Sequence, residues 1–181
     1  MSDLTFNAEL MWSGTGREGV GEVQTDGLAL ELSGPESMGG RGVGANPEEL
    51  LVCAVSSCFT ATLFAVLRRA QLPVDSLAVA ASGTVTGFPG HARFARIVVN
   101  PTVLGGDVER HAEYEEAADI AHYRCLIGRT LGPEVLYQVG SVRVQDDAAR
   151  AATPDQALPP PGHRRPLSDD ADERSPAWRA A

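Results

Sequence analysis

The residues of this chain best suited to covalent or redox chemistry are its three cysteines, Cys53, Cys58 and Cys125. Cys53 and Cys58 share one apolar stretch, and in a helix they would lie on different faces, about 7.5 Å apart along the axis, too far for a disulfide. The sequence has no CxxC motif, so a zinc site has weak support. Taken alone, both thiols are simply explained as small core residues.

A reactive thiol needs a nearby group that stabilises its thiolate form, and the amino-acid composition limits which side chains can supply that group. A buried thiol in apolar surroundings is inert, so a reactive Cys58 needs a cationic group that reaches it from elsewhere in the fold. All fifteen basic residues are arginine. The lack of lysine excludes Schiff-base chemistry on a lysine and a Walker-type phosphate site. The cation must therefore be a guanidinium or an imidazolium.

The net charge and the N-terminus narrow the class of partner. A formal charge of -9 disfavours nucleic acid and an anionic membrane surface, which would repel the protein, and favours a small or apolar ligand. Residues 1–12 contain no basic region followed by an apolar run, so we expect a cytoplasmic protein. In that compartment, cysteines are expected to be reduced thiols or a catalytic pair.

One long helix organises the predicted fold. Asn46 is a good N-cap, Pro47 suits the first turn, and Glu48 and Glu49 favour the positive end of the helix dipole. Residues 50–67 are apolar on nearly every face, which predicts a core helix buried on all sides, with a partner subunit as one source of cover. Its length approaches that of a membrane span, but four hydroxyl side chains within it favour the core helix.

The remaining pattern predicts an α+β domain with the order βββ-α-ββ-α-β over residues 1–145. From residue 146 the composition shifts to Ala, Pro, Asp and Arg, which cannot bury enough apolar surface to offset the entropy of ordering, so 146–181 is predicted to be a disordered tail. The expected strands are 4–12, 19–24, 28–32, 74–87, 92–104 and 135–144, the second helix is 107–123, and a short helical turn covers 126–132.

The chain also resembles a known protein family, and this resemblance gives information about fold and function that the spacing of residues alone does not. Over about residues 5–144, the chain resembles the organic hydroperoxide resistance (Ohr) branch of the OsmC superfamily, with the same order of elements. One departure is clear, since the family usually has Cys-Pro-Tyr-Ser where this chain has Cys125-Leu126-Ile127-Gly128. The motifs that carry the resemblance are Thr15-Gly16-Arg17-Glu18-Gly19, Leu32-Ser33-Gly34-Pro35, Met38-Gly39-Gly40 with Gly42 and Gly44, Asn46-Pro47-Glu48, Ser57-Cys58-Phe59, and Ala121-His122 to Cys125.

The resemblance implies a thiol peroxidase that acts on organic hydroperoxides in oxidative-stress defence, built as an intertwined homodimer. By position, Cys58 resembles the peroxidatic thiol and Cys125 the resolving thiol. Arg17 resembles the arginine beside the thiolate, and Glu48 the glutamate that holds this arginine. These roles agree with the chemistry, because a guanidinium stabilises a thiolate and suits a bidentate grip by a carboxylate.

The implied cycle needs no metal, flavin or haem. Cys58 would be oxidised to a sulfenic acid, Cys125 would condense with it to a disulfide, and an external dithiol, such as protein-bound lipoyl groups, would reduce that disulfide. The apolar helix favours an organic or lipid peroxide over hydrogen peroxide. Two alternatives remain open on the same fold: a small-molecule binding protein without turnover, and a redox sensor that uses the tail to recruit a partner.

Overall fold

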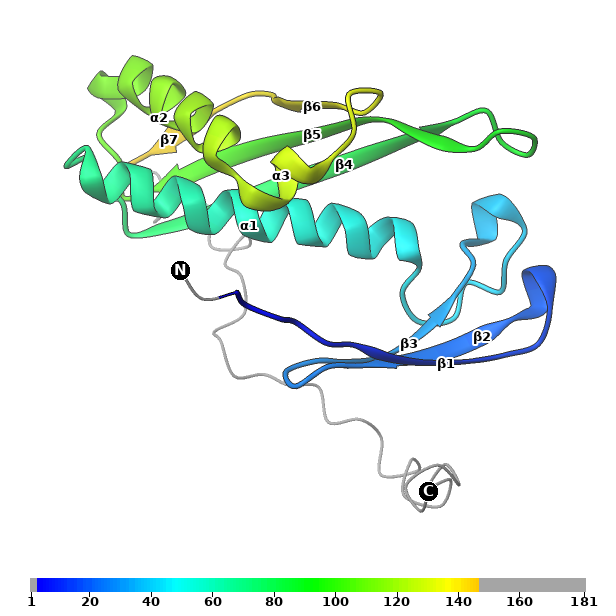
Figure 1. The fold of residues 1–181 in the computed structure, drawn as a ribbon. Helices are drawn as coiled ribbons and strands as arrows, with labels where there is room; N and C mark the ends of the chain where they lie inside the picture. The colour runs from blue at the N-terminus through cyan, green and yellow to red at the C-terminus, as the bar shows by residue number, and fades with distance from the viewer. Residues whose placement is uncertain (1–2, 147–181) are drawn as a thin grey trace.

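The computed structural model describes residues 3–146, which form two β-sheets and three α-helices (Figure 1). The predicted tail lies outside the described residues except for Asp146. In chain order the elements are β1 (Glu9–Ser13), η1 (Gly16–Glu18), β2 (Val20–Gln24), β3 (Ala29–Ser33), η2 (Glu36–Met38), α1 (Pro47–Arg69), β4 (Ser76–Thr86), β5 (Arg93–Leu104), η3 (Val108–Arg110), α2 (His111–Arg124), α3 (Leu126–Thr130), β6 (Leu136–Val139) and β7 (Arg143–Gln145).

The first three strands form a separate antiparallel sheet in the order β1-β2-β3, on the opposite side of α1 from the second sheet (Figure 1). The alternation in residues 4–12 predicted a strand with one buried face, but β1 begins only at Glu9 and all five of its residues are exposed. Leu10 and Trp12 retain 56% and 45% of their surface. The alternation therefore marks an apolar face for which a single chain supplies no core.

Helix α1 begins where the sequence predicted. The Asn46 side chain accepts a hydrogen bond from the Glu49 amide at 2.8 Å, and the Glu49 carboxylate accepts one from the Asn46 amide at 3.2 Å. This reciprocal pair is a capping box, which satisfies two amides that the first turn leaves without partners.

The prediction that α1 is buried on all sides is wrong for one chain. Its buried residues are Val55, Phe59, Leu63, Val66 and Leu67, all on the side that faces the second sheet and α2. Among the described helices, α1 alone is long and apolar enough to cross a membrane, a test that soluble core helices also pass, and 28% of its most apolar window is buried. Its other face remains exposed because the first sheet does not pack onto it.

The second sheet has the order β4-β5-β6, with β7 also paired to β5. β4 and β5 form the predicted hairpin, and β6 and β7 both run parallel to β5. The single strand expected over 135–144 is split, because the Asn100 side chain accepts a hydrogen bond from the Ser141 amide at 2.9 Å. A Cβ atom on Gly140 would lie only 2.2 Å from Asn100 Oδ1, so this close approach requires glycine.

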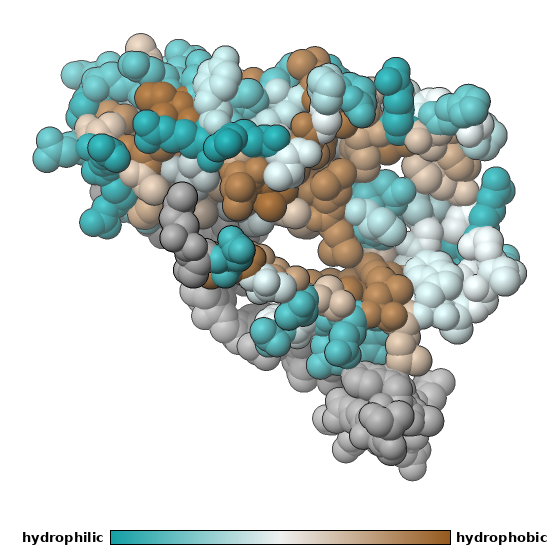
Figure 2. Space-filling model, viewed as in Figure 1, coloured by the Kyte–Doolittle hydropathy of each residue, from teal (hydrophilic) through white to brown (hydrophobic). Residues whose placement is uncertain are grey.

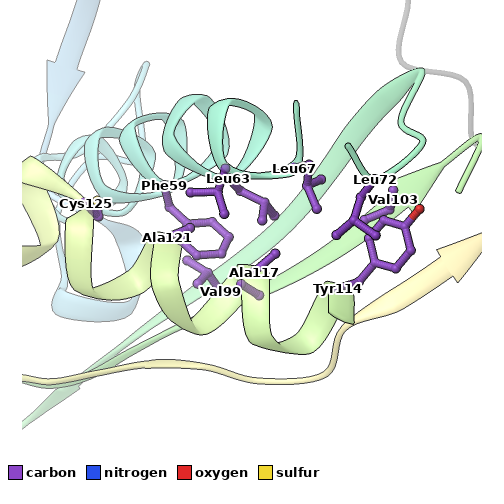
Figure 3. Close-up of a cluster of buried hydrophobic side chains, with 12 residues drawn as sticks. Phe59, Leu63, Leu67, Leu72, Val99, Val103, Tyr114, Ala117, Ala121 and Cys125 are labelled. Carbon is purple, nitrogen blue, oxygen red and sulfur yellow. The ribbon is translucent and has the colours of Figure 1, made fainter. Parts of the chain in front are cut away.

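Helices α1 and α2 enclose the main core with the second sheet, as Figure 3 shows. Phe59 and Leu63 from α1 meet Ala117 and Ala121 from α2 and Val99 from β5, all nearly or fully buried. The small alanines let α2 approach α1 closely. Cys125 lies at the end of this cluster, so the core fixes the position of one candidate catalytic thiol.

Tyr114 offers a direct test of this packing. It is fully buried, its hydroxyl donates to the Pro73 carbonyl at 2.7 Å, and it accepts from the Asp107 amide at 3.0 Å. Tyr114→Phe should lower the free energy of unfolding by about 1–3 kcal/mol, because two backbone groups lose their partner. Urea denaturation followed by circular dichroism measures the change. Tyr123→Phe, at an exposed position, is the matched control, and equal effects of the two substitutions would contradict this account.

Candidate functional site

Two of the predicted site residues, Cys58 and Cys125, come together. Cys58 is partly buried in the middle of α1, and Cys125 is fully buried in the short turn between α2 and α3. Cys125 ends α2, where its amide bonds to the Ala121 carbonyl, and it also caps the start of α3. The chain reverses at this residue and brings the first turn of α3 against α1 (Figure 1).

The first turn of α3 donates backbone hydrogen bonds to both sulfur atoms. The Ile127 amide lies 3.5 Å from Cys58 Sγ, and the Gly128 amide lies 3.3 Å from Cys125 Sγ. These amides have no carbonyl partner within so short a helix, so they are free to solvate a sulfur. The Cys125 thiol in turn lies 4.0 Å from the Val55 carbonyl on α1. Both thiols are therefore held by one turn of backbone.

This arrangement favours the thiolate form of Cys58. Partial burial is the largest single influence and raises the pKa of the Cys58 thiol. Hydrogen bonds from the Ile127 amide, the Cys125 thiol, the Leu126 amide and the Thr62 hydroxyl together outweigh burial, so the pKa lies below its ordinary value. Sequence reasoning required a cation for this effect, whereas backbone amides supply it here.

Cys125 has the opposite bias. Burial, again the largest influence, raises the pKa of its thiol, and the adjacent Cys58 raises it further. The Gly128 amide and the Tyr137 hydroxyl lower it, but less than burial raises it. Of the two thiols, Cys58 is therefore the one that ionises more readily, and Cys125 is the one that keeps its proton to higher pH.

The structure places the other two predicted site residues away from the sulfurs. Arg17 lies in η1, beyond the first sheet, and its guanidinium packs against Gly39, where a Cβ atom would be 2.9 Å from Nη1. Within residues 3–146, Arg17 has no ion pair and does not meet Glu48. Glu48 lies in the first turn of α1, and its Oε2 is buried without a hydrogen-bond partner among the described residues.

Sequence reasoning missed three residues at this site, Ile127, Gly128 and Tyr137. The helical turn predicted over 126–132 was a usable signal for the first two, because a helix that starts beside a cysteine presents free amides to it. Tyr137 gave no such signal, since it reaches the site only through the pairing of β6 with β5. Cys53 was predicted to be a core residue and is instead exposed on the open face of α1.

No group of three or more His, Cys, Asp or Glu side chains is arranged to hold a metal ion between residues 3 and 146. The chemistry that the described site can perform on its own is that of a thiol pair. Of this pair, Cys58 is the thiol whose surroundings favour the nucleophilic thiolate form.

The opposite biases of the two thiols predict an order of alkylation. Iodoacetamide should modify Cys58 with a pH midpoint below that of Cys125, because only the thiolate reacts. Peptide mapping by mass spectrometry at a series of pH values measures each site, with exposed Cys53 as an internal reference in the same molecules. Coincident midpoints for Cys58 and Cys125 would contradict the assigned electrostatics.

Comparison with known structures agrees with this fold. An OsmC-like protein of unknown function from Vibrio cholerae is 21% identical, with a TM-score of 0.62 over 77% of this chain and 100% of the other. A Legionella pneumophila structure, described as an organic hydroperoxide resistance protein OsmC and predicted redox protein, is 22% identical, with a TM-score of 0.63 over 78% and 100% of the two chains.

Comparison of sequences identifies the family. The uncharacterized protein YmaD of Bacillus subtilis strain 168 is 30% identical over 125 residues, which are 69% of this chain and 80% of YmaD. The model of the OsmC-like protein family matches residues 39–139, a range that contains both α1 and the turn that holds Cys125. This chain therefore belongs to the OsmC-like protein family.

Proposed function

We propose that this protein is a thiol-dependent peroxidase that reduces organic hydroperoxides to alcohols. The observation that carries the proposal is the pairing of Cys58 and Cys125 on one turn of backbone with opposite pKa shifts. Opposite pKa shifts suit a two-thiol cycle, because one sulfur must be a nucleophilic thiolate while the other remains a protonated thiol until the second step.

In the proposed cycle, the Cys58 thiolate attacks the distal oxygen of the peroxide. The O–O bond breaks, the leaving alkoxide takes up a proton to become an alcohol, and Cys58 becomes a sulfenic acid. The Cys125 sulfur then attacks the sulfenic sulfur, and the thiol proton leaves with the displaced hydroxyl as water. An external dithiol reduces the resulting disulfide by two exchange steps.

The substrate preference follows from the surroundings of Cys58. Its neighbours include the apolar core cluster and Ile127, and Leu126 exposes 64% of its surface beside them. Apolar surface favours the organic part of an alkyl or lipid hydroperoxide over hydrogen peroxide. The similarity to the Legionella protein described as conferring organic hydroperoxide resistance supports the same substrate class. The dithiol, a lipoyl group in our proposal, would act in the cytoplasm.

Cysteine variants test the peroxidase directly. Stopped-flow measurements with the pre-reduced protein should show faster consumption of cumene hydroperoxide than of hydrogen peroxide, with loss of two thiols per chain. Cys58→Ser should reduce the rate by about a thousandfold or more, since only background oxidation remains. Cys125→Ser should allow one turnover and leave a sulfenic acid that dimedone traps.

Cys53→Ser is the matched control, because it removes from the same helix a thiol that has no step in the proposed cycle, and it should leave the rate unchanged. Unselective, slow oxidation of the parent protein would reject the proposal. Retained affinity for an apolar ligand without turnover would then identify a binding protein, and oxidation-dependent capture of a partner by the tail would identify a redox sensor.

We also propose that the functional protein is a homodimer. Figure 2 shows hydrophobic residues on both sides of an opening between the first sheet and the rest of the chain. The sheet exposes Leu10, Met11 and Trp12, and exposed small residues follow one face of α1. So much exposed apolar surface is typical of an interface. The exposed residues of this α1 face are Cys53, Ala54, Ser57, Ala61 and Ala65.

A second copy would also complete the predicted site. Buried Glu48 Oε2 has no donor among the described residues, and the Arg17 guanidinium has no carboxylate partner there. An unpaired buried carboxylate oxygen is costly. In our proposal, assembly brings an arginine to Glu48 and to the Cys58 thiolate, where it adds to the stabilisation by the amides of α3.

Sedimentation velocity tests the assembly. Ala61→Arg places a bulky charge in the centre of the exposed α1 face and should convert the dimer to monomer, with about a tenfold or greater weakening of association. Ala112→Arg, the same substitution on an exposed position of α2, should leave the dimer intact. A parent protein that sediments as a monomer at micromolar concentration would reject the homodimer.

A further inference from the structure

Tyr137 is a polar residue beside Cys125 to which the proposed cycle assigns no step. It lies on β6, where Ile97 is its register partner on β5, and its ring packs against the main core cluster. Its hydroxyl oxygen is buried and makes no hydrogen bond of ordinary geometry with any residue between 3 and 146. A buried phenol without a partner is costly, so its position calls for an explanation.

The phenol ring has two close neighbours. The His122 ring lies 4.5 Å from it, centre to centre, and His122 Nε2 is 3.0 Å from the Tyr137 carbonyl oxygen. The second neighbour of the ring is Gly128, where a Cβ atom would lie only 2.3 Å from Tyr137 Cε1. Any larger residue at 128 would push the ring away from the turn, so the glycine permits this contact.

The Tyr137 ring packs against the first turn of α3. The same turn holds the Cys125 sulfur, since the Gly128 amide donates a hydrogen bond to Cys125 Sγ at 3.3 Å. The phenol and Cys125 also influence each other electrostatically. The Tyr137 hydroxyl favours the thiolate form of Cys125 and so lowers the pKa of that thiol, although no formed hydrogen bond joins the two groups in this structure. Burial and the negative charge of the neighbouring thiolates raise the pKa of Tyr137, so the phenol keeps its proton and can donate a hydrogen bond.

We propose that Tyr137 is a positioning residue for the resolving step, whose hydroxyl donates a hydrogen bond to the Cys125 sulfur as that sulfur becomes a thiolate. The step forms the Cys58–Cys125 S–S bond and breaks the S–O bond of the sulfenic acid. The Cys125 proton leaves with the hydroxyl as water, and Tyr137 ends the step with its own proton. The contact tightens only when charge develops on sulfur, which explains why the hydroxyl has no strong bond in the reduced protein.

The first measurement does not depend on peroxidase activity. In full-length protein with Cys53→Ser and Cys58→Ser, Cys125 is the sole thiol, and its ionisation is followed by absorbance at 240 nm against pH. Adding Tyr137→Phe should raise the midpoint by about one pH unit, because the thiolate loses a donor. Adding Tyr123→Phe, the matched change at an exposed tyrosine, should not move it. An unchanged midpoint in the Tyr137→Phe protein overturns the proposal.

The second measurement rests on the proposed function and separates the two steps. In Tyr137→Phe with all cysteines present, sulfenic acid should form at the parent rate, while disulfide formation slows about tenfold at pH 7. The deficit should vanish above the Cys125 midpoint, where the thiolate forms without help. A pH-independent deficit would indicate a packing defect and overturn the proposal.

The two measurements also keep the two proposals distinguishable. If the parent protein consumes no peroxide, the proposed function fails, and the titration of Cys125 still decides the role of Tyr137. Replacement of Tyr137 by 3-fluorotyrosine keeps the ring and provides a stronger donor, so it should lower the midpoint. A fluorinated phenol that raises the midpoint would contradict donation to sulfur.

Discussion

Two sulfur atoms depend on the free amides of one short helical turn, and this constraint explains much of the fold. The Ile127 and Gly128 amides reach Cys58 and Cys125 only while α3 stays against α1. That contact is fixed by α2, which packs its alanines on α1 and ends at Cys125 itself. A dense interior tolerates little displacement, so the core sets the geometry of the thiols.

Local sequence signals correctly predicted those elements whose structure depends on contacts between residues close together in the chain. Asn46 and Pro47 fix the start of α1 through contacts within four residues, and the strands of the β4–β5 hairpin follow from alternation and a turn. The pairing of Cys58 with Cys125 was inferred from family resemblance alone, since the two residues come from helices far apart in the chain. Only the packing of α3 on α1 makes them neighbours.

The features that sequence did not predict are those set by how distant segments are arranged. The sequence pattern of an apolar helix is the same whether its second face packs against the same chain or against another one. The exposure of Cys53 and Ala61 in a single chain therefore could not be predicted from sequence. Arg17 carries a suitable charge, but its location depends on where the first sheet lies. Tyr137 is brought to the site by the pairing of β6 with β5, which its local sequence does not indicate. The amide donors belong to the backbone, so the types of the side chains do not reveal them.

The difference in exposure between the sulfurs also constrains how the proposed disulfide would be reduced. Cys125 is fully buried and Cys58 is not, so an incoming dithiol can reach only the Cys58 sulfur. Attack there expels Cys125 as the leaving thiolate, into surroundings whose burial raises its pKa and slows its departure. The Gly128 amide and the Tyr137 hydroxyl oppose that penalty in both directions of the exchange. Donors that stabilise the Cys125 thiolate raise the fraction of thiolate that can attack the sulfenic acid, and the same stabilisation makes Cys125 a better leaving group from the disulfide, so a single cluster of donors would serve both halves of the cycle.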